Sequence, residues 1–306
     1  MKNKKAFGII TLLITSIIWG LAFVFQRSGM DHIEPITFNA ARMSAGALFV
    51  VVICIIRDLI SKKAINKDHI ESKKSITKNT IIGGVGCGLF LTFASLVQQM
   101  GLVETSAGKA GFITAMYMLF VPIINLIFFK KKGSAKVWIA VIIGIIGMYL
   151  LCVKEKLEFE NGDALVLLCA VLFAGHILWC DRFAPQSDAV KMSAIQFIVA
   201  GSLSWVFSFI FESPTIDQII SATVPILYCG LVSGGIGYTL QIVGQQCIDP
   251  APASIIMSLE SVFAVLAGVL LLNESMTIQE IIGCIIMFIA IILVQLPSKE
   301  NNKTKD

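Results

Sequence analysis

The sequence predicts an all-α integral membrane protein with ten transmembrane helices in two inverted five-helix repeats. Of its 306 residues, 56% are hydrophobic and only 14% are charged, and the mean hydropathy is +0.84. Such a composition lies far from that of soluble globular proteins. Ten apolar windows have the length of about 20 residues that a helix needs to cross roughly 30 Å of hydrocarbon. The two halves of the chain also share matched motifs, which indicate an internal repeat.

The ten predicted spans are separated by short connections, so no separate soluble domain is expected. The first apolar run is too long for the core of a cleaved signal peptide, and no small-residue cleavage site follows it, so we predict a retained first helix. In order, the spans are residues 7–26, 35–56, 81–101, 107–129, 137–153, 164–180, 193–211, 222–246, 251–272 and 278–296.

Basic residues predict the orientation of the spans. With the N-terminus placed in the cytoplasm, 19 of the 24 Lys and Arg residues fall in cytoplasmic segments. Four lie outside (Arg27, Lys109, Lys154 and Lys156), and Arg42 lies within a helix. This asymmetry follows the positive-inside rule. We therefore predict a multi-pass cell-membrane protein with both termini cytoplasmic, including the tail 297–306. The net charge of +4 reflects this orientation, and no nucleic-acid partner is expected.

The first spans of the two halves align without gaps. Residues 12–27, LLITSIIWGLAFVFQR, match residues 167–182, LLCAVLFAGHILWCDR, so that Gly20 pairs with Gly175 and Arg27 with Arg182. The alignment predicts two repeats, residues 7–153 and residues 164–296.

Later spans support the same division. The third span of each half carries a glycine cluster and ends in a Gln-Gln pair, Gln98 and Gln99 in one and Gln245 and Gln246 in the other. Residues 116–128 correspond to residues 259–271. Two hydrophobic halves could look alike by chance, but these matched polar and glycine positions argue against that explanation.

An odd number of spans per repeat requires the second repeat to cross the bilayer in the opposite sense. The flanking charges agree, because Lys130, Lys131 and Lys132 follow the fourth span on the inside, whereas residues 273–275, NES, follow the ninth span on the outside. Inverted repeats are typical of transporters that alternate access around a central site.

Three stretches carry a resemblance to a known family. IIWG in the first span, FNAAR in the second and SLESVFAVLAGVLLLNE in the ninth resemble the EamA-type transporters of the drug/metabolite transporter superfamily, over nearly the whole chain. The resemblance implies an exporter whose cavity is walled by spans 1 to 4 and 6 to 9. Ser261 stands where that family usually carries proline, so a kink in the ninth span is not expected from it, whereas Pro122 permits one in the fourth.

Glu260 is the leading candidate for a functional residue. It lies nine residues into the ninth span, about 12 to 14 Å from the cytoplasmic end and so near the midplane. A carboxylate in lipid costs at least roughly 2.5 to 3.5 kcal/mol, so it should face the bundle interior or a wet cavity. It could bind a cationic group or couple protons, or it could be a structural acid bonded to a neighbouring helix.

Arg42 lies about a third of the way down the second span, with Asn39 on the same face at i−3. It could bind an anionic substrate group or pair with Glu260. Snorkelling and anchoring of helix ends is the alternative interpretation.

The remaining candidates are polar or aromatic residues within spans. Tyr238, Gln241 and Gln245 form one stripe of the eighth span, suited either to a polar ligand or to interhelical bonds. His176 could relay protons or be a neutral core histidine, and Trp179 lies near it. Trp19 and Tyr117 could line the cavity or pack in the core. Gln98 is the last candidate.

No cofactor, metal site or catalytic constellation is predicted, so the chain is not expected to be an enzyme. The eight cysteines show no metal-like spacing, and GGVGCG within an apolar span is no phosphate loop. The absence of a Walker-type loop excludes ATP as the direct fuel.

The sequence therefore predicts a secondary-active transporter of a small polar metabolite, an amino acid or related amine, exporting by alternating access. A multidrug or organic-cation exporter and an uncoupled facilitator are the alternatives. Expected partners are the substrate, protons through Glu260 and the lipid bilayer. The interiors of the spans 137–153 and 278–296 are apolar all round, which suits lipid contact or a homodimer face.

Overall fold

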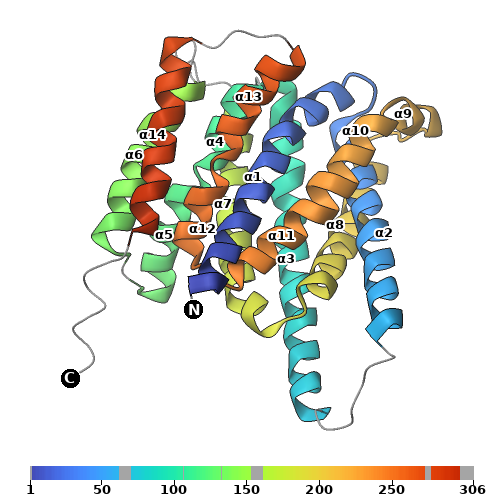
Figure 1. Ribbon diagram of the computed structural model, residues 1–306. Helices are drawn as coiled ribbons and strands as arrows, with labels where there is room; N and C mark the ends of the chain where they lie inside the picture. The colour runs from blue at the N-terminus through green and yellow to red at the C-terminus, as the bar shows by residue number, and fades with distance from the viewer. Residues whose placement is uncertain are drawn as a thin grey trace.

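The computed structural model describes residues 2–61, 70–105, 107–131, 133–152, 161–272 and 277–296, which form a bundle of helices without strands (Figure 1). The orientation arguments that used Lys132, Lys154, Lys156, residues 273–275 and the tail 297–306 lie outside these described residues.

The described residues of the first half form six helices. They are α1 (Lys2–Gly29), α2 (Pro35–Ser61), α3 (Ile70–Glu104), α4 (Ala107–Ala115), α5 (Tyr117–Phe129) and α6 (Ala135–Cys152).

In the second half, the part of the chain that the structure describes forms ten helical elements. They are α7 (Asn161–Phe183), η2 (Ala184–Gln186), α8 (Ala189–Phe211), α9 (Ile216–Ser221), α10 (Thr223–Leu227), η3 (Tyr228–Tyr238), α11 (Thr239–Gln245), α12 (Pro250–Met257), α13 (Glu260–Leu272) and α14 (Ile278–Gln295).

These elements confirm the all-α membrane fold. Over the described ranges, nine helical stretches are long and apolar enough to cross a membrane, and the shorter apolar helix 135–150 supplies the tenth predicted span. Several helices exceed the predicted bounds: α1 starts at Lys2, and α3 starts at Ile70 where residue 81 was predicted. The hydropathy pattern detects only the apolar part of a helix, and the polar turns beyond it remain helical.

The fourth and ninth spans are interrupted where single helices were predicted. In the fourth, the Met116 amide donates to the Ile113 carbonyl at 3.2 Å, and in the ninth, the Leu259 amide donates to the Ile256 carbonyl at 3.2 Å. Both are i→i−3 bonds that tighten one turn and redirect the chain. Met116 and Leu259 are equivalent positions in the repeat alignment, so the two halves break at the same place.

The break in the ninth span forms without proline. The Ser258 hydroxyl donates to the Ile255 carbonyl at 2.8 Å, and the Ser261 hydroxyl donates to the Ser258 carbonyl at 2.6 Å. Such side-chain bonds compete with the helical ladder and bend helices. The absence of proline at position 261 therefore does not keep this helix straight.

The eighth span is also irregular, because η3 is a π-helix of 11 residues. Its wider turns leave carbonyls for neighbouring helices: Trp19 Nε1 donates to the Ser233 carbonyl at 3.2 Å. Gly230 permits close approach of α2, since a Cβ there would lie 2.7 Å from the Arg42 carbonyl oxygen. Long π-helices are rare and frequently mark functional sites.

Contacts between the two halves come in matching pairs of helices. The second and seventh spans, α2 and α8, run antiparallel, with Thr37 beside Ser208 at one end and Arg57 bonded to Asp188 at the other. Helices α6 and α14 also pack together, α3 packs on α7, and α1 packs on η3 and α11, as two related halves require (Figure 1).

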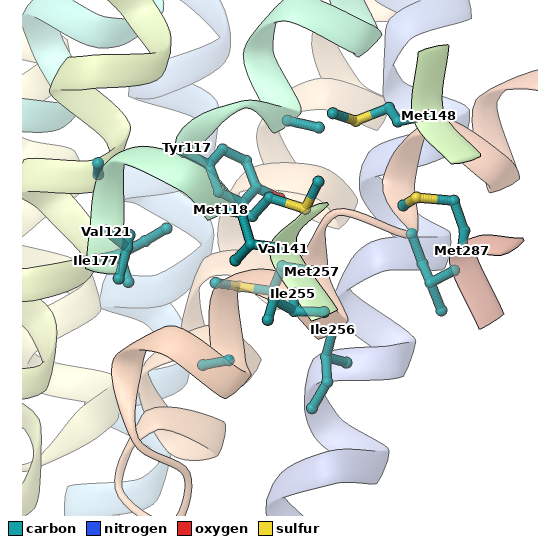
Figure 2. Packing of buried hydrophobic residues seen from close by; sticks show 14 of the residues in the cluster. Tyr117, Met118, Val121, Val141, Met148, Ile177, Ile255, Ile256, Met257 and Met287 are labelled. Carbon is teal, nitrogen blue, oxygen red and sulfur yellow. The ribbon is translucent and has the colours of Figure 1, made fainter. Parts of the chain in front are cut away.

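A cluster of buried apolar side chains surrounds the two helix breaks (Figure 2). It draws on both sides of each break, with Ile113 from α4 and Tyr117 from α5, and with Ile256 from α12 and Val262 from α13. Methionines of this cluster fill irregular space of the kind that broken helices leave. The packing therefore fixes the position of both breaks near the middle of the bundle.

Candidate functional site

A central cavity lies between the two halves and is lined by most of the helices. Its volume open to the centres of water molecules is about 40 Å³, enough for a few waters. The lining residues are Trp19, Ala22, Phe23, Gln26, Arg42, Gln98, Thr114, Tyr117, Phe173, His176, Ile177, Ser233, Tyr238, Gln241 and Glu260.

The helix breaks place two of these side chains. Tyr117 is the first residue of α5, and Glu260 is the first residue of α13. A helix that starts inside the bundle directs its unpaired amides and positive dipole end there, which favours a carboxylate such as that of Glu260. Irregular backbone at membrane depth is tolerated where it lines a cavity.

A glycine brings α1 against the start of α13. A Cβ at Gly20 would lie 2.7 Å from the Glu260 carbonyl oxygen, so only glycine allows this approach. Trp19, the residue before Gly20, lines the same cavity. The match of Gly20 in the repeat alignment thus has a local packing reason.

Glu260 is buried, with 4% of its surface exposed, and Tyr117 beside it is 2% exposed. Neither Glu260 Oε1 nor the Tyr117 hydroxyl has a hydrogen-bond partner among the described residues. Buried polar atoms are normally paired. The two groups lie close enough to interact with each other but make no well-formed hydrogen bond, so a water or a bound molecule beside them would satisfy both atoms.

Arg42 supplies a buried cation to the cavity and is 5% exposed. Its Nε donates to Asn39 Oδ1 at 3.0 Å, and Asn39 Nδ2 donates to Ser204 Oγ at 3.0 Å. Asn39 therefore orients Arg42 and does not itself line the cavity. In the described part of the chain, Arg42 and Glu260 form no ion pair with each other.

Amide and aromatic side chains complete the wall. His176 Nε2 and Gln196 Oε1 are 3.1 Å apart, and the His176 ring meets Tyr238 edge-on at 5.7 Å between centroids. Gln98 Nε2 donates to Thr114 Oγ1 at 3.2 Å. Trp19 packs on Tyr238 with 4.7 Å between ring centroids.

Three predicted candidates lie beside or away from the cavity. Asn39 supports Arg42, as above. Gln245 donates to the Ile177 carbonyl at 3.0 Å and accepts from Gln241 at 3.1 Å, so it supports a cavity residue. Trp179 faces a different, lipid-side groove and donates to the Ile82 carbonyl at 3.3 Å.

The cavity includes polar residues that sequence reasoning did not select. Gln26 is matched with Asp181 when the first spans of the two halves are aligned, so both halves carry a polar residue at this position. That match could have identified Gln26 as a cavity residue. Thr114 and Ser233 are ordinary residues for a membrane helix interior, so nothing in the sequence distinguishes them.

Comparison with known proteins supplies the family. The model of the EamA-like transporter family matches residues 6–153 and again residues 160–296. An uncharacterized transporter of Archaeoglobus fulgidus is 26% identical over 293 residues, covering 96% of this chain and 87% of that protein. The uncharacterized transporter YoaV of Bacillus subtilis is 25% identical over 289 residues, covering 93% of this chain and 94% of its own length.

A solved crystal structure shares the fold, with a TM-score of 0.75, 16% identity and 99% of both chains covered. The fold, the repeated family match and the transporter relatives agree with one another. The chain therefore belongs to the EamA-like transporter family and is a multi-pass membrane transporter, not an enzyme.

Proposed function

We propose that this transporter is a secondary-active exporter of a small zwitterionic amine, such as an amino acid. It would work by alternating access between two inverted halves, residues 7–153 and 164–296. The observation that carries the proposal is that one buried cavity is lined by a cation, Arg42, and a carboxylate, Glu260, that do not pair with each other.

A zwitterion would complement both charges. Its carboxylate can accept hydrogen bonds from the Arg42 guanidinium, and its ammonium group can donate to Glu260. Unpaired buried charges are costly. A ligand that pairs with both at once removes that cost, which contributes favourably to its binding free energy. The amides of Gln26, Gln98 and Gln241 add uncharged hydrogen-bond partners that still permit release.

The narrow volume of the cavity supports a gated mechanism. About 40 Å³ holds a few waters, whereas pockets for drug-sized ligands measure roughly 300 to 1,000 Å³. Entry of a metabolite therefore requires helices to separate at one end of the bundle. This conformation corresponds to a nearly closed state of the cycle.

Contacts that could gate the cavity lie at both ends. At the end opposite the N-terminus, Arg27 Nη1 donates to the Leu102 carbonyl at 2.6 Å, and Lys109 Nζ lies 2.6 Å from Asp163 Oδ2. Thr105 Oγ1 also donates to Asp163 Oδ1, at 2.9 Å.

The other end, called here the basic end, carries Lys5, Arg57 and Arg182. There Gln246 Nε2 donates to the Ala184 carbonyl at 2.9 Å, and Arg57 Nη1 donates to Asp188 Oδ1 at 2.9 Å. We assign the basic end and both termini to the cytoplasm because of the positive-inside bias. Export would then load substrate at the basic end.

Proton coupling through Glu260 follows from the same geometry. The Glu260 carboxylate would bind the substrate ammonium group when the cavity opens to one side of the membrane and a proton when it opens to the other side. Substrate and protons would then cross the membrane in opposite directions. An organic-cation exporter is less compatible with the cavity, because Arg42 on its wall would repel a ligand that is only cationic.

Transport in proteoliposomes, with and without a pH gradient, tests the proposal for a panel of labelled amino acids and amines. Wild type should accumulate an amino acid against its gradient when protons flow in the opposite direction. Glu260→Gln should lose that proton-driven accumulation. Glu104→Gln, at an exposed carboxylate, is the matched control and should behave as wild type. Wild-type flux that never exceeds equilibrium would indicate an uncoupled facilitator and contradict coupling.

A further inference from the structure

An apolar groove runs along the lipid-facing side of the bundle between α3 and α7, separate from the central cavity. Its volume is about 530 Å³. The lining residues are Ile81, Ile82, Val85, Gly86, Leu89, Phe90, Phe93, Leu172 and Trp179. We propose that this groove, with Lys78 and Arg182 at its basic end, binds an anionic phospholipid.

The length of the groove matches one leaflet. From Ile81 to Phe93 the helix rises about 18 Å at 1.5 Å per residue. Half of a hydrocarbon core of roughly 30 Å is about 15 Å. An acyl chain that starts at the basic end would therefore lie along the groove as far as the middle of the membrane.

Helical spacing places both cations in line with the groove. Lys78 lies three and four residues before Ile81 and Ile82, so it shares their face of α3. Arg182 lies three residues after Trp179, which shares a face of α7 with Leu172 seven residues earlier.

The two helices bring these cations to the same end. They run antiparallel, because a Cβ at Gly83 would lie 2.8 Å from Phe183 Cβ, whereas Gly101 packs beside Val166 at the far end. Asn79 donates to Gln186 at 2.7 Å, which ties the two chain segments together there. Lys78 and Arg182 are both exposed.

Charge complementarity selects the ligand. A phosphodiester headgroup at the membrane surface would meet two cationic side chains, and basic sites between membrane helices favour anionic headgroups at about 1 kcal/mol per Lys or Arg. A zwitterionic lipid gains less, because its own ammonium group opposes the same cations. The groove therefore accepts any acyl chain, and the headgroup determines the preference.

Trp179 gives a direct readout, because among the described residues it is the tryptophan that lines the groove. In full-length protein reconstituted in vesicles, brominated phosphatidylglycerol should quench Trp179 fluorescence more strongly than brominated phosphatidylcholine at the same mole fraction. In Trp179→Phe the excess quenching by the anionic lipid should disappear.

The double substitution Lys78→Gln with Arg182→Gln should weaken the anionic preference by about 25-fold, at about a factor of five per cation. Lys4→Gln with Lys5→Gln, which removes two exposed charges at the same end, should retain the preference. Equal quenching by the two lipids, or an anionic preference that survives the Lys78 and Arg182 substitutions, would overturn the proposal.

Discussion

At the residue scale, the cavity is built from side chains that are expensive to bury. Arg42 and Glu260 attract attention in the sequence because a charge within an apolar span needs a reason, and both line the cavity. Trp179 was selected as the aromatic neighbour of His176 and lines the outer groove, because the sequence does not reveal which face of α7 turns inward. Buried charge alone does not select the cavity either, since buried Asp163 pairs with Lys109 away from it, whereas Trp19 lines it.

A second residue-scale feature is Asp188, which lies between two spans and connects α8 to α2. Its carboxylate accepts bonds from Arg57 and caps α8 through the amides of Val190 and Lys191. Partial burial raises the pKa of Asp188, but the hydrogen bonds from Arg57 and from the Lys191 amide outweigh it and hold the pKa below its ordinary value.

Asp188→Asn should lower the midpoint of thermal unfolding at pH 7 by a few degrees, because asparagine retains the cap but loses the ion pair. A depressed folded pKa stabilises the protein above the unfolded value of about 3.9 and loses that contribution as pH falls through the folded value. The difference between variant and wild type should therefore shrink below about pH 4. Unfolding curves at both pH values measure this, and a difference that does not change with pH would contradict the assignment.

At the element scale, the sequence predicts ten spans well and their interruptions poorly. Length and apolar composition determine a span, so each predicted span has a helical counterpart. The breaks at Met116 and Leu259 depend on a few local bonds, such as those of Ser258 and Ser261, that hydropathy does not detect. The π-helix η3 is likewise invisible, since its glycines also suit close α-helical packing.

The break before α13 predicts where proline is tolerated. Ser261 lies in the first turn of α13, and its amide makes only a 3.3 Å bond to the Ser258 carbonyl. Ser261→Pro should therefore change the midpoint of thermal unfolding by no more than a few degrees.

Leu266→Pro, in the interior of the same helix, is the control and should cost about 3 kcal/mol or more. Thermal unfolding of purified protein compares the two variants. Equal destabilisation by both substitutions would show that α13 continues through the break.

At the scale of the whole molecule, helices of the two halves make matching contacts, which are compatible with the repeat alignment but were not predicted from it pair by pair. The alignment cannot predict whether the cavity is open or closed. The contacts proposed as gates, such as that of Lys109 with Asp163, join residues that have no matched counterpart in the other repeat. Opening and closing must break such contacts at one end while those at the other persist.

Asp163→Asn should therefore open the end opposite the N-terminus. In a variant with the native cysteines replaced, a Gln98→Cys side chain should react several-fold faster with an impermeant thiol reagent added from that side. Asp217→Asn, at an exposed carboxylate of α9, is the control and should leave the rate unchanged. If Asp163→Asn reacts no faster than the control, this ion pair is not a gate.

The central claim, that Arg42 and Glu260 bind opposite ends of one zwitterion, is tested most directly by titration calorimetry. The ligands are an amino acid that stabilises the protein, its decarboxylated amine and its deaminated acid. Loss of one partner of a buried charge pair costs about 2 to 5 kcal/mol, or at least about 30-fold in affinity. Arg42→Gln should lose that much for the amino acid but not for the amine, and Glu260→Gln for the amino acid but not for the acid. Equal losses for all three ligands in either variant would contradict the claim.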